Sequence, residues 1–189
     1  MYRFCAATIA LLSLISPAFA HTGTGTHFAF VDGFAHPLFG LDHLLTMVGV
    51  GLWAALAGGK ERWVWPIAFV TVMIAGGALA LNGIAMPFVE AMILTSVIGI
   101  GAAVAFGLRV PLVAGAAICA SFAIAHGHAH GAELPAGASA IGYVAGFVVA
   151  TAALHATGIY AGLRLQRSTF LMRLAGTAIA ATGALLAFA

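Results

Sequence analysis

The sequence has few charged side chains: Lys and Arg number seven, Asp and Glu number five, and together they make up 6% of 189 residues. Soluble domains usually carry about 25% charged residues. Hydrophobic residues make up 63% of this chain, which is more apolar surface than a soluble core absorbs but suits a lipid bilayer. The formal net charge of +2 is too small to indicate a nucleic-acid partner. The composition predicts an all-α integral membrane protein that forms a single domain.

Cysteine is also scarce, with one residue at Cys5 and one at Cys119. Residues 1–20 have the layout of a secretory signal peptide, with one positive charge, a short apolar run and the A-x-A-like tripeptide AFA before position 21. An uncleaved anchor helix is the alternative, but the apolar run is short for one. We therefore predict cleavage after Ala20 and a mature domain of residues 21–189. That domain keeps a single cysteine, which excludes an intrachain disulfide.

Long apolar runs, by contrast, fill most of the chain. About twenty apolar residues are needed to cross the hydrocarbon core of a membrane. On this criterion the sequence predicts six transmembrane helices, bounded by Gly, Pro and charged residues. They are Leu38–Ala57, Trp63–Leu81, Met86–Leu108, Pro111–His126, Ala138–Tyr160 and Phe170–Phe188.

Positive charge is confined to alternate loops. If the mature N-terminus lies outside, the loops after the first, third and fifth predicted helices lie inside. These loops contain every Lys and Arg of the mature chain, as the positive-inside rule requires. The residues are Lys60, Arg62, Arg109, Arg164, Arg167 and Arg173. We therefore predict a multi-pass protein of the bacterial inner (cytoplasmic) membrane, with both mature termini in the periplasm.

Against this apolar background, a few ionisable residues gather at the predicted outer ends of three helices. Such residues inside a membrane commonly pair with one another and mark paths for ions or protons. Imidazole with carboxylate suits nickel, cobalt, zinc, copper or iron, whereas magnesium and calcium prefer oxygen ligands alone. The sequence therefore predicts a divalent transition-metal site. Its candidate ligands are His36, Asp42, His43, Glu90, His126, His130 and Glu133.

The stretch HGHAHGAE has a regular helical pattern. At ~100° per residue, His126, His130 and Glu133 share one helix face, and His128 lies roughly opposite. Gly127 and Gly131 form a G-x-x-x-G pattern, which allows another helix to approach closely.

The stretch HPLFGLDH leaves two arrangements open. Residues seven apart, such as His36 and His43, are separated by about 10.5 Å along an ideal helix, which is long for one shared ion. Either the backbone bends near Pro37 and Gly40, or the two imidazoles serve successive positions. Asp42 either binds metal directly or holds His43 by its second ring nitrogen.

At these residues the sequence resembles the HupE/UreJ family of nickel and cobalt permeases. The family's H-P-x-x-G-x-D-H segment matches positions 36–43, and its A-H-G-x-E segment matches positions 129–133. The signal peptide, the six spans and the length match as well. The resemblance implies uptake of Ni²⁺, or of Co²⁺, for hydrogenase or urease maturation. In that case the metal is the transported ion rather than a catalytic cofactor, and the protein is not an enzyme. The carried-over residues are His36, Asp42, His43, His130 and Glu133.

Other interpretations use the same side chains. An intramembrane metal-dependent hydrolase would need the same ligands and an activated water. A haem protein would need paired histidines, but His43 and His155 are expected at different depths. For His155 we expect a structural hydrogen bond, with an exit-side metal ligand as the alternative. His21 and His27 would form a metal-gathering arm, or else belong to a disordered tail.

Overall fold

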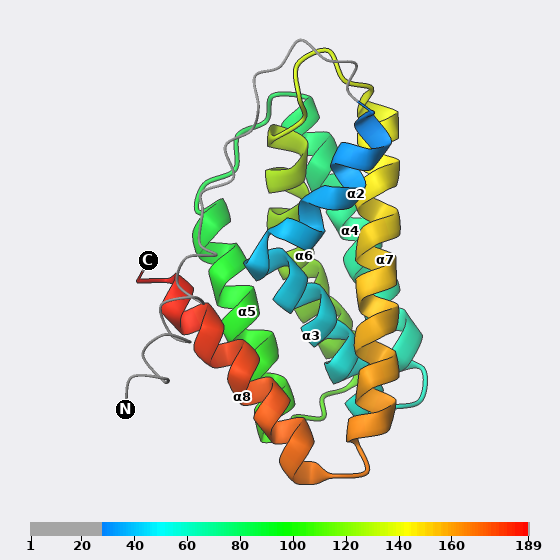
Figure 1. The fold of residues 1–189 in the computed structure, drawn as a ribbon, viewed down its shortest axis with the longest axis vertical. Coiled ribbons are helices and arrows are strands. Elements are labelled where there is room, and N and C mark those ends of the chain that lie inside the picture. The colour runs from blue at the N-terminus through cyan, green and yellow to red at the C-terminus, as the bar shows by residue number, and fades with distance from the viewer. Residues whose placement is uncertain (1–27, 189) are drawn as a thin grey trace, which may run out of the picture.

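The computed structural model describes residues 28–188. The predicted signal peptide, its cleavage site and the proposed arm with His21 and His27 lie outside this range. The described residues form seven helices and no strand, which confirms the all-helical prediction (Figure 1). The helices are α2 (Ala29–Phe39), α3 (Leu41–Ala57), α4 (Glu61–Leu81), α5 (Val89–Phe106), α6 (Leu112–Ala132), α7 (Ala140–Leu165) and α8 (Thr169–Leu186).

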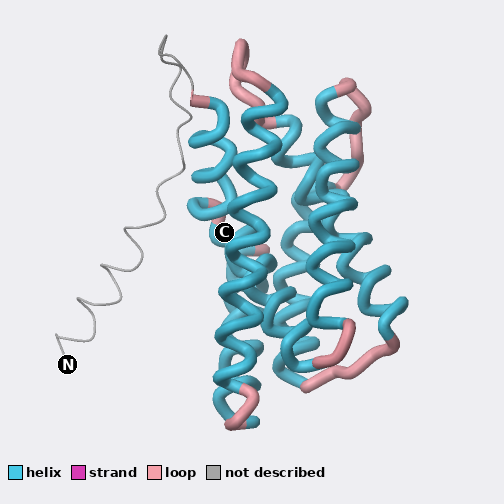
Figure 2. Tube along the Cα trace, turned by 90° about the vertical axis from the view of Figure 1, so that its right-hand side faces the viewer, coloured by secondary structure: helices cyan, strands magenta, loops and turns pink. Residues whose placement is uncertain are grey.

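Five helices, α4 to α8, are each long and apolar enough to cross a membrane. The pair α2 and α3 also qualifies when it is counted as one broken span, which gives up to six spans. The helices run side by side, with most loops gathered at two ends (Figure 2). The predicted number of apolar spans therefore agrees with the structure, although α6 continues to Ala132 rather than ending at His126.

The first span begins at Ala29 rather than at the predicted Leu38, and it is not straight. α2 and α3 meet at a 79° bend, and the residue between them, Gly40, has an extended backbone with φ −78° and ψ 107°. Pro37 lies in the last turn of α2, where its ring restricts the backbone. A Cβ atom on Gly40 would lie 3.2 Å from Asp42 Oδ1 and 3.3 Å from His43 Nδ1. The small residue therefore permits the close approach of this pair, whereas any residue can adopt the extended backbone at the bend.

α3 is the central helix, since it packs against α4, α5 and α7. The most extensive pairings are α4 with α6, α5 with α8, and α7 with both α2 and α3. The predicted close approach at the G-x-x-x-G pattern of α6 is confirmed. A Cβ on Gly127 would meet the carbonyl oxygen of Met73 in α4, and one on Gly131 would meet that of Gly77. Small residues thus let α4 and α6 touch through their backbones beside the histidines of α6.

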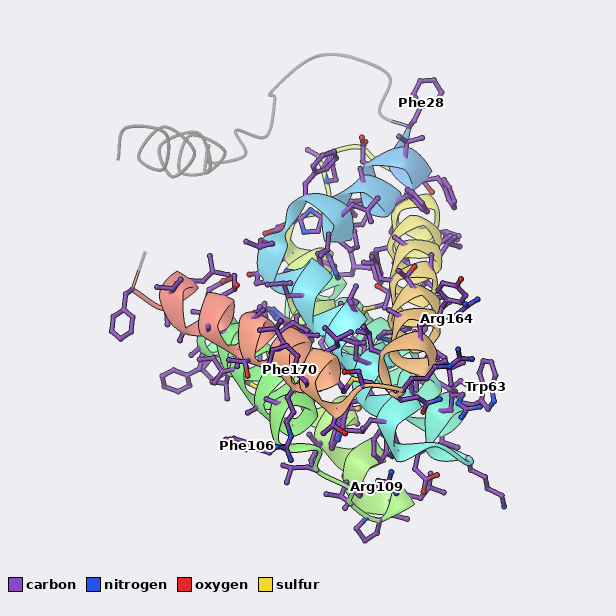
Figure 3. All side chains as sticks on the ribbon, turned by 60° about the horizontal axis from the view of Figure 1, so that its bottom comes forward. Phe28, Trp63, Phe106, Arg109, Arg164 and Phe170 are labelled. Carbon is purple, nitrogen blue, oxygen red and sulfur yellow. The ribbon has the colours of Figure 1, made fainter. Side chains whose placement is uncertain are left out.

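The loops that carry or adjoin the basic residues lie together at one end of the bundle. These are the α3–α4, α5–α6 and α7–α8 connections at the bottom of Figure 1. Figure 3 shows Arg109 and Arg164 toward this end, with Trp63 nearby and Phe28 at the opposite end. We refer to this end, defined by those three loops, as the basic end.

Candidate metal centre

Three histidines from different helices meet near the end of the bundle opposite the basic end. His36 of α2, His43 of α3 and His130 of α6 each offer a ring nitrogen, and these atoms lie within 4.8 Å of one another. The ring centroids are 4.8 Å apart for His36 and His130, and 4.7 Å apart for His43 and His130. This histidine cluster (His36, His43 and His130) could hold one divalent cation. Nitrogens that each lie about 2 Å from one ion are about 3.3–4 Å apart, so the rings would move slightly closer together around it.

The bend at Gly40 decides between the two arrangements that the sequence left open for His36 and His43. Their ring centroids are 5.8 Å apart, at an interplanar angle of 84°. A straight helix would hold them about 10.5 Å apart along its axis. The broken span therefore brings both imidazoles to one position instead of to two successive ones.

Asp42 holds His43 by its second ring nitrogen. Its Oδ1 lies 2.8 Å from His43 Nδ1 and accepts a hydrogen bond from the His43 backbone N–H at 2.7 Å. Because an ionised carboxylate only accepts hydrogen bonds, Nδ1 carries the proton and Nε2 presents its lone pair. Nε2 of His43 is buried and has no hydrogen-bond partner among the described residues. Of the two roles considered for Asp42, the geometry favours this one.

Glu133, the residue that follows α6, contacts His36. Its Oε2 lies 2.7 Å from His36 Nε2. The hydrogen bond from His36 holds the pKa of the Glu133 carboxyl below its usual value, which keeps the carboxylate ionised. The Glu133 side chain is 53% exposed, so this carboxylate lies at the outer side of the histidine cluster. Two carboxylates, Asp42 and Glu133, therefore flank the three imidazoles and favour a cation there.

His130 is fully buried and stacks on Phe147, with ring centroids 4.8 Å apart and an interplanar angle of 16°. Neither of its ring nitrogens has a hydrogen-bond partner among the described residues. Buried polar atoms are normally paired, and an unpaired one costs about 1–3 kcal/mol. An imidazole held by packing and left with a free lone pair is the arrangement expected of a metal ligand.

His126 lies beside the cluster, one turn along α6 from His130. Its ring centroid is 4.7 Å from that of His43, and its Nε2 lies 2.9 Å from Ser96 Oγ in α5. Ser96 Oγ also lies 2.6 Å from the Ile93 carbonyl oxygen and 2.9 Å from Thr46 Oγ1. A hydroxyl has one proton, and the Ile93 carbonyl can only accept it. His126 Nε2 therefore donates to Ser96, and its buried, unpartnered Nδ1 keeps a lone pair.

Glu90 does not join these side chains. It is exposed in the first turn of α5 and is not among the residues whose ligand atoms meet. An acid in a first turn complements the helix dipole. Its role as a ligand stays a prediction. His128 faces away from the cluster, as expected, and its Nε2 lies 2.9 Å from the Ile84 carbonyl oxygen.

The structural hydrogen bond expected for His155 is wrong. The residue is 2% exposed in α7, and neither ring nitrogen has a partner among the described residues. Its ring instead meets Phe69 edge to face. Sequence reasoning also missed Ser96, Phe69 and Phe147, because a small hydroxyl or an aromatic residue in an apolar helix has no local signature of contact with histidine.

Comparisons with known proteins identify the family of this chain. A family model described as HupE / UreJ protein matches residues 9–186. The chain is 44% identical to a protein named Protein HupE from Rhizobium leguminosarum bv. viciae over an alignment of 187 residues. This alignment covers 97% of the chain and 98% of the relative. No solved structure matches the chain significantly. By sequence over nearly its whole length, the chain belongs to the HupE/UreJ family.

Proposed function

We propose that this protein takes up divalent nickel, or cobalt, across the bacterial inner membrane. The meeting of His36, His43 and His130 between apolar helices carries the proposal. Ligand atoms within 4.8 Å of one another suit a single transition-metal ion, and membership of the HupE/UreJ family supports an accessory role in hydrogenase or urease maturation. The metal is the transported ion, and no catalytic cofactor is part of the proposal.

The residues divide into two roles in this proposal. The ion binds Nε2 of His43, a ring nitrogen of His130 and His36. His126 offers Nδ1 as the next ligand deeper in the bundle. Asp42 fixes the orientation and tautomer of His43, and Glu133 attracts the cation and orients His36. Conduction requires that the ion bind reversibly, so the affinity of this site must be moderate.

The direction of transport follows from the positions of the charges. The basic end, with Arg109 and Arg164 (Figure 3), lies in the cytoplasm under the positive-inside rule. The histidine cluster then opens toward the periplasm, where Glu133 is exposed. Cleavage of residues 1–20 after export, with both mature termini in the periplasm, is part of this proposal.

Cell-associated metal measured by mass spectrometry tests the function. Cells that lack other nickel uptake would express the chain and receive trace nickel, cobalt, zinc and manganese together. Selective gain of nickel or cobalt over cells with empty vector is the expected result. No gain of any metal, together with metal that stays bound through purification, would instead support an intramembrane metal-dependent hydrolase built on the same side chains.

Ser96→Ala is expected to raise the nickel concentration that gives half-maximal uptake by about tenfold, in the range typical of lost outer-shell partners. The change removes the acceptor of His126 Nε2–H, so the ring no longer has a fixed tautomer or orientation. Ser121→Ala is the matched control, since Ser121 makes the same bond to a carbonyl three residues earlier in α6 but is exposed. Equal uptake by the Ser96→Ala and Ser121→Ala variants would contradict this role of Ser96.

A further inference from the structure

Among the residues that the structure describes, His155 is the one buried histidine that the proposed centre does not use. It lies in α7, twelve residues toward the basic end from Tyr143, whose ring is 6.4 Å from that of His36. Twelve helical residues rise about 18 Å, so His155 lies well inside the bundle relative to the histidine cluster. Both of its ring nitrogens are buried without a hydrogen-bond partner among the described residues. A buried imidazole is normally paired, and packing alone does not require a polar ring here.

A single aromatic ring lies between His155 and the histidines of the proposed metal centre. The Phe69 ring of α4 lies 5.6 Å from the His126 ring and 5.2 Å from the His155 ring, centroid to centroid. His126 contacts His43 in turn. The imidazoles therefore form a series of ring contacts from the histidine cluster through His126 to Phe69 and then to His155. No Lys or Arg interrupts this series, because all of those in the described chain belong to the basic end.

Polar atoms also lie one helical turn from Phe69 and His155. Thr151 precedes His155 by one turn on α7, and Met73 follows Phe69 by one turn on α4. Both are fully buried, and Thr151 Oγ1 donates to Met73 Sδ at 3.6 Å. A thioether and a hydroxyl are weak ligands for a transition metal. On its other side, His155 borders an open groove of about 260 Å³ between α4 and α7 that extends to Trp63, near the basic end.

We propose that His155 is a second binding position for the transported divalent transition metal, on the far side of Phe69 from the histidine cluster. The inference rests on the proposed transport function. An ion that leaves His126 passes the Phe69 ring and binds a ring nitrogen of His155 before it reaches the basic end. Two positions separated by one aromatic ring allow an ion to advance without a single tight site, which would hold it too long.

The test uses the purified full-length chain in vesicles that contain a metal-sensitive dye. His155→Gln keeps a polar side chain of similar size but offers no imidazole. We expect it to lower the maximal rate of nickel influx by about tenfold or more. Its equilibrium binding of nickel at the histidine cluster should equal that of the wild type, which also reports correct folding. His128→Gln is the matched control, since His128 lies on α6 and faces away from the cluster.

A second variant separates ligation from packing. A thiolate favours softer metals, so His155→Cys should raise the ratio of cadmium to nickel influx relative to the wild type. A structural histidine would not change this ratio. Wild-type influx by His155→Gln, or an unchanged cadmium-to-nickel ratio in His155→Cys, would overturn the role of His155. A wild-type chain that binds nickel but moves no metal would refute the transport function itself.

Discussion

Asp42→Ala is expected to lower nickel uptake at limiting metal by about 10–100-fold, the range found when an outer-shell partner of a metal-bound histidine is lost. The carboxylate accepts two hydrogen bonds from His43, one from the ring and one from the backbone. Without it, no hydrogen bond fixes the His43 ring and its proton is shared between both nitrogens, so Nε2 no longer always presents a lone pair. Uptake of radioactive nickel by cells with equal membrane levels of the protein measures the effect.

Asp42→Asn separates the charge of Asp42 from its geometry. The amide oxygen can still accept from His43 Nδ1, so this variant should retain more uptake than Asp42→Ala. Equal loss in both variants would mean that the negative charge, or direct ligation by Asp42, matters more than the orientation of His43. Wild-type uptake in Asp42→Ala would contradict the proposed role of this residue altogether.

His130→Ala is expected to abolish measurable nickel uptake and to weaken nickel binding by the purified protein by about 100-fold or more, since an inner ligand is lost as well as its orienting contacts. His130 is the histidine that joins the other two, because its ring contacts both His36 and His43. It is fully buried, so neither water nor another side chain replaces it at low cost. Isothermal titration with nickel gives the affinity, and uptake in cells gives the function.

His128→Ala provides the comparison for this variant. The two histidines are on the same helix, two residues apart, and the change in size is identical. Only His130 faces the cluster, whereas His128 contacts the Ile84 carbonyl oxygen. We therefore expect His128→Ala to bind and take up nickel as the wild type does. Similar losses in both variants would indicate that disruption of α6, rather than removal of a ligand, explains the effect.

Several features followed from the sequence because their causes are local. Apolar runs of about twenty residues satisfy the bilayer on their own, so the number of candidate spans agreed with the structure. The helical period placed His126 and His130 on one face, and both are buried. Pairing of Gly127 and Gly131 with another helix was also predictable, because small residues four apart have few other uses in a membrane helix.

The contacts between helices could not be predicted in the same way. Nothing near Ser96 in the sequence indicates His126, thirty residues away, and nothing near Phe69 indicates His155. Such pairs form because glycines and alanines let particular helix faces approach each other. Which faces approach depends on the packing of the whole bundle. The same reason explains why Glu90, which the sequence grouped with the ligands by depth alone, is exposed on α5.

By itself, the sequence determined the membrane character of the chain, the loops near which its cations gather and the kind of ligands it offers. Hydropathy, charge and side-chain chemistry are properties of residues and their neighbours along the chain. The tertiary structure alone decided that α2 and α3 bend by 79°, that three imidazoles share one position, and that Phe69 lies between His126 and His155. These are relations between segments, and only the packing of the helices against one another sets the distances between them.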